Sequence, residues 1–262
     1  MTADSRAAAP VDAVLTGVGV GPGDPELLTL KAVRVLRAAD LVFVPVMADR
    51  PASAADRDGA AGRAERTVLA HVGADRLRRL PFALDDRGGV SPRRAAAWDA
   101  AARAVVEAVD AGARALAFAT IGDPNVYSTF GYLAQSVRAS RPAVRVATVP
   151  GITAMQELAA RSGTPLCEGR EPLTLLPATA GLALFADALA GPGTVVAYKG
   201  WRRHPELVGE LRRQGRLADA VLGCGLGLPD ERIGGVDEAE YDLPYLSTLL
   251  VPARRDRRGG KL

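Results

Sequence analysis

Short apolar runs alternate with amphipathic segments along the first half of the chain. Residues 14–20 (VLTGVGV) predict a short buried strand, residues 28–39 predict a helix with apolar positions at 30, 33 and 36, and residues 41–45 predict a second strand. A strand, a helix and a strand within about thirty residues form the unit from which parallel sheets are built. The pattern therefore predicts an α/β fold.

The alternation continues after one interruption. Residues 48–66 (ADRPASAADRDGAAGRAER) have no apolar period, and we interpret them as a mobile loop. Beyond the loop, the pattern predicts a helix over 95–111, strands over 114–120 and 144–149, and a helix that runs from residue 153 toward Gly163.

The second half of the chain changes character, and we place a domain boundary near residues 150–165. Here the pattern predicts strands over 173–177, 194–198, 220–222 and 245–251 and helices over 181–190 and 204–214. The sequence thus predicts two α/β domains, 12–150 and 151–254, with a frayed, disordered tail (1–11) and a basic tail (255–262). Clefts at strand ends and domain junctions are where such proteins usually bind ligands.

Composition excludes several classes of protein. The 262 residues are 48% hydrophobic, enough for a sizeable core, and a net charge of +3 is too mild to require a polyanionic partner. Aromatic residues make up 5% and do not interleave with a basic stripe, which argues against a nucleic-acid partner. No apolar run approaches the ~20 residues that cross a bilayer. We therefore expect a cytoplasmic protein without membrane contact.

Cysteine and histidine usage gives no sign of a metal. Cys167 and Cys224 lie far apart and outside any C-x-x-C pattern, so we expect neither a disulfide framework nor a zinc cluster. His71 and His204 lack metal-ligand spacing, and we assign them no catalytic role.

The stretch GVGVGPGDP (17–25) resembles a dinucleotide loop only at first sight. The fingerprint G-x-G-x-x-G requires a third glycine one place away and a helix that begins at once, with free amides for phosphate. Pro22 and Pro25 remove two amide donors, and the carboxylate of Asp24 would repel phosphate. The stretch therefore indicates a tight, glycine-lined turn for another kind of ligand.

Two further strand ends carry similar residues. They are TIGDPNVYSTFGYL (120–133) and VPGITA (149–154). Each alone is typical of an ordinary turn. Three such ends on one parallel sheet are expected to converge along one edge, with their backbone groups exposed toward a ligand.

Together these residues resemble the tetrapyrrole methylase family, the S-adenosylmethionine-dependent enzymes of corrin and sirohaem synthesis. The resemblance rests on GVGPGDPELLTLKAVRVLRAADLVFVP, GDPNVYSTFGYL, VPGITA and VVAYKG and spans about residues 13–252. Within the family, GDPNVYSTFGYL and GTPLCEGREPLTLLPAT most resemble members that methylate C20 of precorrin-2. Sirohaem-branch members usually carry a Phe-Gly-Arg-Gly run, where this chain has Tyr127-Ser-Thr-Phe130.

The resemblance implies two α/β domains, an interdomain cleft for S-adenosyl-L-methionine, a small tetrapyrrole substrate, a homodimer and no metal. S-adenosyl-L-homocysteine would be the product. Lys199 stands where some relatives carry methionine. Carried over by position, the cofactor-binding residues are Pro22, Ile121, Gly122, Asp123, Val126, Thr153, Ala154, Lys199 and Gly225.

Methyl transfer from a sulfonium mainly requires alignment of the reacting atoms, because the leaving thioether is neutral. A base is needed only to remove a proton after attack, and the candidates are Asp123, Tyr127, Glu168 and Glu171. We take Asp24 and Tyr127 as the catalytic candidates, with Asp24 facing the tetrapyrrole; the alternative is a turn-forming or capping role for Asp24. Arginines first considered for the substrate's carboxylates are Arg50, Arg93, Arg94, Arg202 and Arg203.

Three alternatives stay open at the level of sequence. The substrate could be the cobalt-containing counterpart of precorrin-2, or the methyl group could go to another ring position, as in the uroporphyrinogen reaction. A third alternative is a non-catalytic binding module that retains the fold.

Overall fold

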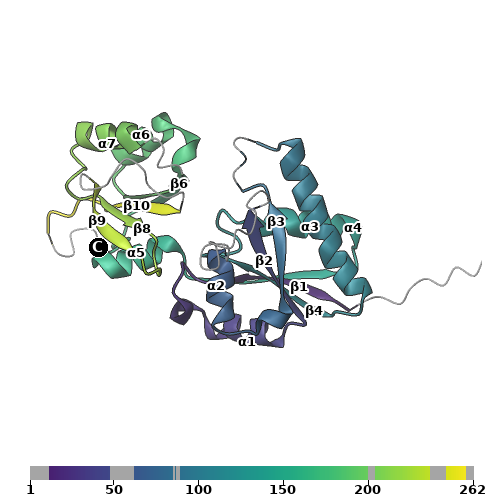
Figure 1. Cartoon of the computed structure of the whole chain (residues 1–262). Coiled ribbons are helices and arrows are strands. Elements are labelled where there is room, and N and C mark those ends of the chain that lie inside the picture. Colours follow the sequence, from purple (N-terminus) through teal and green to yellow (C-terminus); the bar gives the residue numbers. More distant parts are fainter. Residues whose placement is uncertain are drawn as a thin grey trace, which may run out of the picture. The chain divides into compact units, whose positions relative to one another are not determined.

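The computed structural model describes residues 12–47, 62–84, 86, 89–199, 204–236 and 246–257 (Figure 1). By its internal contacts the chain divides between Ile152 and Thr153 into two compact units. Each unit consists of one β-sheet with helices on both faces.

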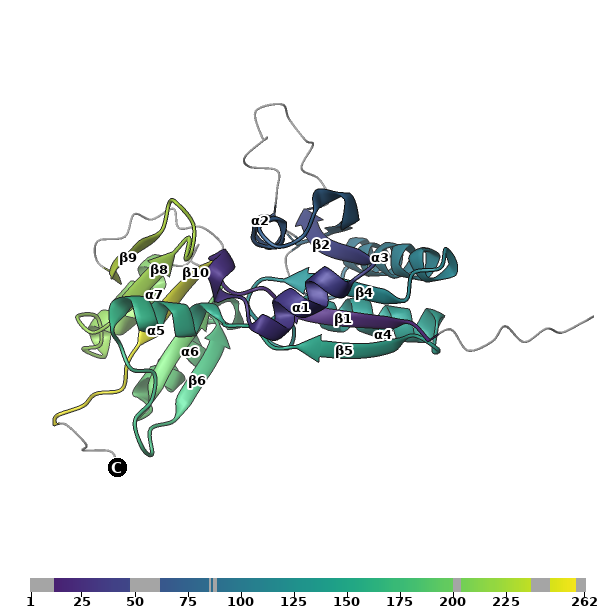
Figure 2. The same ribbon diagram turned by 90° about the horizontal axis from the view of Figure 1, so that it is seen from below.

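The first unit contains a five-stranded sheet in the order β3-β2-β4-β1-β5, and every pairing is parallel. Figure 2 shows β1 between β4 and β5. The predicted parallel α/β sheet is confirmed. Its strands are β1 (Val14–Gly19), β2 (Leu41–Met47), β3 (Leu77–Phe82), β4 (Ala115–Thr120) and β5 (Arg145–Val149).

Two pairs of helices cover this sheet. Alternate side chains of β4 point to opposite faces, as the pleat of a strand requires. Phe118 belongs to the core beneath α3 and α4, whereas Ala117 and Ala119 belong to the core beneath α1 and α2. The helices are α1 (Leu30–Ala38), α2 (Arg63–Leu69), α3 (Pro92–Asp110) and α4 (Phe130–Ser140).

The second unit contains a mixed sheet in the order β6-β7-β10-β8-β9, in which only β6 and β7 pair in parallel. Its α6 and α7 pack on one core and α5 packs on the other. The strands are β6 (Leu173–Pro177), β7 (Thr194–Tyr198), β8 (Val221–Cys224), β9 (Arg232–Gly235) and β10 (Ser247–Val251). The helices are α5 (Ala154–Ser162), α6 (Leu182–Ala190) and α7 (His204–Arg213).

The structure corrects several element predictions. The predicted loop 48–66 ends early, because residues 63–66 already belong to α2; residues 48–61 lie outside the described part. The side chains that α2 buries include Glu65 and Thr67, so its buried face carries no apolar period. Strands β3 and β9 and helix α4 were not predicted. Leu30, one of the apolar positions predicted for α1, is 90% exposed because the helix buries Ala32 and Leu36, and position 30 lies on the opposite face from Ala32.

The chain's tails were also predicted from sequence. The predicted disordered tail 1–11 and residues 258–262 of the predicted basic tail lie outside the described residues. Arg255, the first residue of the predicted basic tail, is anchored in the second unit by an ion pair with Glu171.

Asp40 joins the starts of two neighbouring strands. Its Oδ2 accepts hydrogen bonds from the backbone N–H groups of Ala115 and Arg114, both at 2.8 Å. These two bonds, with that from Ala115 the larger cause, lower the pKa of Asp40. The charged form of Asp40 therefore helps to hold β2 beside β4.

This lowered pKa predicts a pH-dependent contribution to stability. A depressed carboxylate pKa stabilises the fold above the ordinary value of 3.8, and this stabilisation is lost as the pH falls through the lowered pKa. We expect Asp40→Ala to lower the free energy of unfolding by about 1 kcal/mol at pH 7, after allowance for solvent screening. Urea unfolding should show this difference shrink below pH 3.8. The control Asp12→Ala removes an exposed ion pair with Arg145 and should change little; an equal loss in both variants would contradict the prediction.

Candidate functional site

The topology of the first sheet marks the carboxyl end of β1 and β4 as a place for a ligand. These strands are neighbours, but α1 after β1 and α4 after β4 pack on opposite faces of the sheet. Loops that leave adjacent parallel strands toward opposite faces create a crevice, and α/β sheets bind ligands at this position.

Three loops meet at this edge, one after each of β1, β4 and β5. The N–H of Gly122 donates to the carbonyl of Gly21 at 2.8 Å. A Cβ added to Gly19 would lie 2.5 Å from the Gly122 oxygen, and one added to Gly151 would lie 2.1 Å from the same oxygen. The predicted convergence of the three strand ends is confirmed, and glycine is required because the backbones approach so closely.

The loop after β1 is not built for phosphate. A short 3₁₀ turn over Pro25–Leu27 follows Asp24, and α1 begins only at Leu30, so no helix amides follow the glycines directly. Asp24 Oδ1 accepts a hydrogen bond from the N–H of Glu26 at 2.8 Å. The capping role that the sequence left open for Asp24 is thus observed, and it uses one of the two carboxylate oxygens. Pro22 is buried.

Asp123 connects the loop after β4 to the loop after β5. Its Oδ1 accepts from the N–H of Asn125 at 2.8 Å, and its Oδ2 accepts from the N–H of Gly151 at 3.0 Å. Its carbonyl accepts from the N–H of Val126 at 3.2 Å. Since both carboxylate oxygens accept backbone bonds, the geometry favours a positioning role for Asp123 over that of a base.

Tyr127 and Lys199 have an unusual backbone conformation. Their φ angles are +49° and +58°, and within the described ranges no other non-glycine residue has a positive φ. Such conformations cost about 1–3 kcal/mol and cluster at ligand sites. Burial raises the pKa of the Tyr127 phenol, so this hydroxyl is protonated at neutral pH and can donate a hydrogen bond.

The second unit also gathers predicted residues at one sheet edge. Lys199 follows β7 and Gly225 follows β8. Both strands run antiparallel to β10, which lies between them, so their carboxyl ends lie at the same edge of the sheet. The N–H of Met155, in the first turn of α5, donates to the hydroxyl of Tyr198 at 2.8 Å. This bond brings the start of α5, with Thr153 and Ala154, to the end of β7.

Thr153 is held in place by its own helix. Its N–H and hydroxyl both donate to Oε1 of Gln156, at 2.8 and 3.0 Å. Ala154 packs against the core formed by Leu158, Val196, Leu226 and Leu250. The start of α5 is therefore fixed from two sides.

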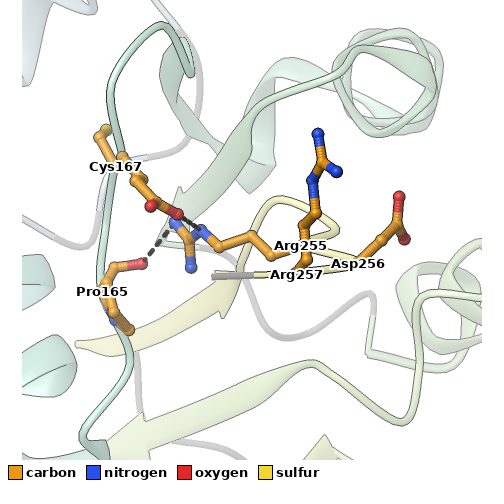
Figure 3. Close-up of a pocket in the computed structure, with 6 residues that line it drawn as sticks. Pro165, Cys167, Arg255, Asp256 and Arg257 are labelled. Atoms are coloured by element: carbon orange, nitrogen blue, oxygen red, sulfur yellow. Dashed lines mark hydrogen bonds and ion pairs between the residues drawn. The ribbon is translucent and has the colours of Figure 1, made fainter. Parts of the chain in front are cut away.

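A separate pocket of the second unit is lined by Pro165, Cys167, Glu168 and Arg255–Arg257 (Figure 3). Arg255 Nε lies 3.0 Å from Glu171 Oε1 and 3.4 Å from Glu168 Oε2. The Glu171 side chain is 1% exposed. Both carboxylates, considered in the sequence analysis as bases, thus lie against the guanidinium of Arg255.

The arginines singled out from the sequence are only partly described. Arg94 donates to the carbonyls of Asp86 and Gly89, both at 2.5 Å, and so braces the segment before α3. Arg93 lies in the first turn of α3. Arg50, Arg202 and Arg203 lie outside the described residues.

Two residues that contact the site were missed by sequence reasoning. Thr67 and His71 donate to carbonyls of the loop after β1. Sequence reasoning missed Thr67 because α2 has no apolar period, and it missed His71 because histidine was considered only as a metal ligand or a catalytic residue. Of the helices in the described part of the chain, none is long and apolar enough to cross a membrane.

Comparisons with known proteins match most of the chain to one family. The family model described as tetrapyrrole (corrin/porphyrin) methylases matches residues 14–241. A precorrin-2 C(20)-methyltransferase from Sinorhizobium is 32% identical in an alignment of 251 positions, which covers 93% of this chain and 96% of the relative. A cobalt-precorrin-2 C(20)-methyltransferase from Salmonella typhimurium is 30% identical over 90% of this chain and 95% of its own length.

Solved structures agree in fold. A cobalt precorrin-4 methyltransferase aligns with a TM-score of 0.64 at 19% identity, over 93% of this chain and 96% of that one. A uroporphyrin-III C-methyltransferase from Thermus thermophilus, complexed with S-adenosylhomocysteine, aligns with a TM-score of 0.60 at 24% identity, over 91% of this chain and 97% of that one.

Proposed function

Because the chain belongs to the tetrapyrrole (corrin/porphyrin) methylase family, we propose that it transfers the methyl group of S-adenosyl-L-methionine to C20 of precorrin-2, giving precorrin-3A in cobalamin biosynthesis. One observation carries this proposal. Relatives that match nearly end to end, at 30–32% identity, are named C(20)-methyltransferases of precorrin-2 and cobalt-precorrin-2.

The residues at the strand ends suit this cofactor. S-adenosyl-L-methionine has no phosphate, and the loop after β1 lacks the amides of Pro22 and Pro25 and has no helix start behind its glycines. When bound, the cofactor supplies an electrophilic methyl group on a sulfonium. The residues proposed to hold it are Pro22, Ile121, Gly122, Asp123 and Val126 in the first unit and Thr153, Ala154, Lys199 and Gly225 in the second.

In this proposal the main contribution of the chain's own residues is to hold the reacting groups in position. Asp123 fixes the loop after β4 against Gly151, and the strained backbone at Tyr127 sets the direction of that side chain. Rigid placement of reacting groups contributes several kcal/mol to a displacement reaction. The protonated Tyr127 hydroxyl donates a hydrogen bond to the substrate, and Asp24 faces the tetrapyrrole.

The role of Asp24 can be separated from its cap. Asparagine caps a turn as well as aspartate does but carries no charge. If the carboxylate acts on the tetrapyrrole, we expect Asp24→Ala and Asp24→Asn both to lower kcat by about 10²-fold, within the range for one catalytic group. Calorimetry should then show S-adenosyl-L-methionine affinity within about threefold of the wild type for Asp24→Asn, because asparagine keeps the capping bond. Full activity in Asp24→Asn would reduce Asp24 to its observed cap.

The reaction is tested by locating the transferred methyl group. The protein is incubated anaerobically with carbon-labelled S-adenosyl-L-methionine and either precorrin-2 or cobalt-precorrin-2, and the product is analysed by carbon NMR. We expect label at C20. Label at another carbon would overturn the position, and faster turnover of the cobalt substrate would assign the chain to the route represented by the Salmonella relative.

The assembly and surroundings are part of the same proposal. We expect a cytoplasmic homodimer that requires no metal, nucleic acid or membrane. Light scattering of the purified protein tests the dimer, and activity retained after treatment with a chelator tests the independence from metal.

A further inference from the structure

We propose that α2 is a brace for the loop after β1, and that His71 and Thr67 are positioning residues for methyl transfer. The brace itself is a property of the fold, whereas its role in the reaction rests on the proposed function. Neither residue belongs to the motifs by which the family was identified.

Three carbonyls of this loop accept hydrogen bonds from outside it. Gly21 accepts from the N–H of Gly122 at 2.8 Å. Gly23 accepts from the hydroxyl of Thr67 at 3.3 Å, and Pro25 accepts from Nε2–H of His71 at 2.9 Å. The anchored carbonyls belong to alternate residues, and the two anchors nearest the 3₁₀ turn come from α2 and from the turn that follows it.

The loop depends on these anchors because it can supply few bonds of its own. Pro22 and Pro25 have no N–H to donate. Asp24 caps the turn from within, through its side chain to Glu26 and its carbonyl to Leu27. Pro22 and Asp24, which we propose to meet cofactor and substrate, each lie between two anchored carbonyls. A shift of α2 would therefore displace both.

Helix α2 and the turn after it are held in place by contacts of their own. Ala64 and Val68 of α2 are buried in the core beneath α1 and α2. Glu65, buried on the same helix, receives hydrogen bonds from Nε of Arg79 on β3 at 2.9 and 3.1 Å. The carbonyl of His71 accepts from Nε of Arg37, on α1, at 3.3 Å. Contacts with the core, β3 and α1 thus fix the donors relative to the sheet.

The two anchors are unequal. The single hydroxyl hydrogen of Thr67 is shared between the Gly23 carbonyl and the Arg63 carbonyl of its own helix, which is nearer at 3.0 Å. The bond from His71 to the Pro25 carbonyl is shorter than the bond from Thr67 to Gly23, and its hydrogen goes to this one carbonyl. A carbonyl can only accept, so Nε2 carries the hydrogen in this bond. His71 is therefore the more important positioning residue.

The experiment compares four variants of the full chain. His71→Ala removes the donor, His71→Gln keeps a donor at the reach of Nε2, and Thr67→Val removes the hydroxyl without changing the shape. Arg66→Ala, at an exposed position on the same helix, is the matched control. Hydrogen–deuterium exchange of the peptide 20–29 reports the brace directly, and steady-state methyl transfer to precorrin-2 reports its role in the reaction.

We expect His71→Ala to speed exchange in this peptide about fivefold, the factor for losing one hydrogen bond, and to lower kcat/KM about tenfold. His71→Gln should restore both to within about twofold, Thr67→Val should show a smaller effect, and Arg66→Ala should show none. A general loss of stability would not be rescued by glutamine and would speed exchange throughout the first unit.

Each result that differs from these expectations contradicts a specific part of the proposal. Unchanged exchange in His71→Ala overturns the brace, whatever the protein's activity. Faster exchange with unchanged kcat/KM overturns the positioning role, and so does equal loss in His71→Ala and His71→Gln. A wild type that binds no S-adenosyl-L-methionine overturns the proposed function and with it the positioning role, while exchange still decides the brace.

Discussion

Replacing Gly151 with alanine is expected to lower S-adenosyl-L-methionine affinity and methyl transfer more than 10²-fold. The added Cβ would lie 2.1 Å from the carbonyl oxygen of Gly122 and 2.8 Å from the backbone of Gly19. These are backbone atoms, which cannot rotate away, so the loops after β1, β4 and β5 must separate. Separation also stretches the bond from the Gly151 N–H to Asp123.

The control for this variant is Gly131→Ala in α4. A Cβ at Gly131 meets no atom within 4 Å, and alanine favours the helix by about 0.5–1 kcal/mol. Calorimetry with S-adenosyl-L-methionine and circular dichroism should show a folded protein without measurable affinity for Gly151→Ala and normal affinity for Gly131→Ala. Normal affinity in Gly151→Ala would show that the three loops do not form the cofactor site.

Replacing Arg255 with methionine is expected to destabilise the second unit by about 3 kcal/mol. The side chain of Glu171 is 1% exposed and lies within hydrogen-bond reach of Arg255 Nε and Nη2. Without the guanidinium, the buried carboxylate must either stay charged without its partner or take up a proton, and both cost free energy. Methionine retains the length of the arginine stem, so the loss reports the ion pair rather than packing.

Two further variants test this explanation. In Arg255→Met/Glu171→Leu no charge is left buried, and we expect most of the lost stability to return. Arg145→Ala removes an exposed ion pair with Asp12 and should change the free energy of unfolding by less than about 0.5 kcal/mol. Urea unfolding measures all three. If the double variant is as unstable as Arg255→Met, the ion pair is not the cause.

The sequence predicted most strands because each is a short apolar run bounded by glycine, proline or charge. β4 is typical, since the residues 114–120 form one such run and the strand is Ala115–Thr120. α2 was missed for the opposite reason. The side chains it buries include Glu65 and Thr67. The Glu65 carboxylate accepts from Arg79 on β3, and the Thr67 hydroxyl lies within reach of the distant Gly23 carbonyl as well as of a carbonyl of its own helix. A binary pattern of apolar and polar positions cannot show such partners.

The sequence by itself determined the family, the parallel sheet and the three glycine-containing strand ends, because these depend on local backbone chemistry. Gly122 and Gly151 could be recognised as turn residues from their neighbours alone, and Gly19 belongs to the strand predicted over 14–20. Only the tertiary structure decided what the polar residues do. Asp123 joins two loops, Glu171 neutralises Arg255, and His71 holds the loop of Asp24. Each of these roles depends on a partner between 28 and 84 residues away, and hydrogen bonds over such separations are set by how the strands are ordered, which no local pattern specifies.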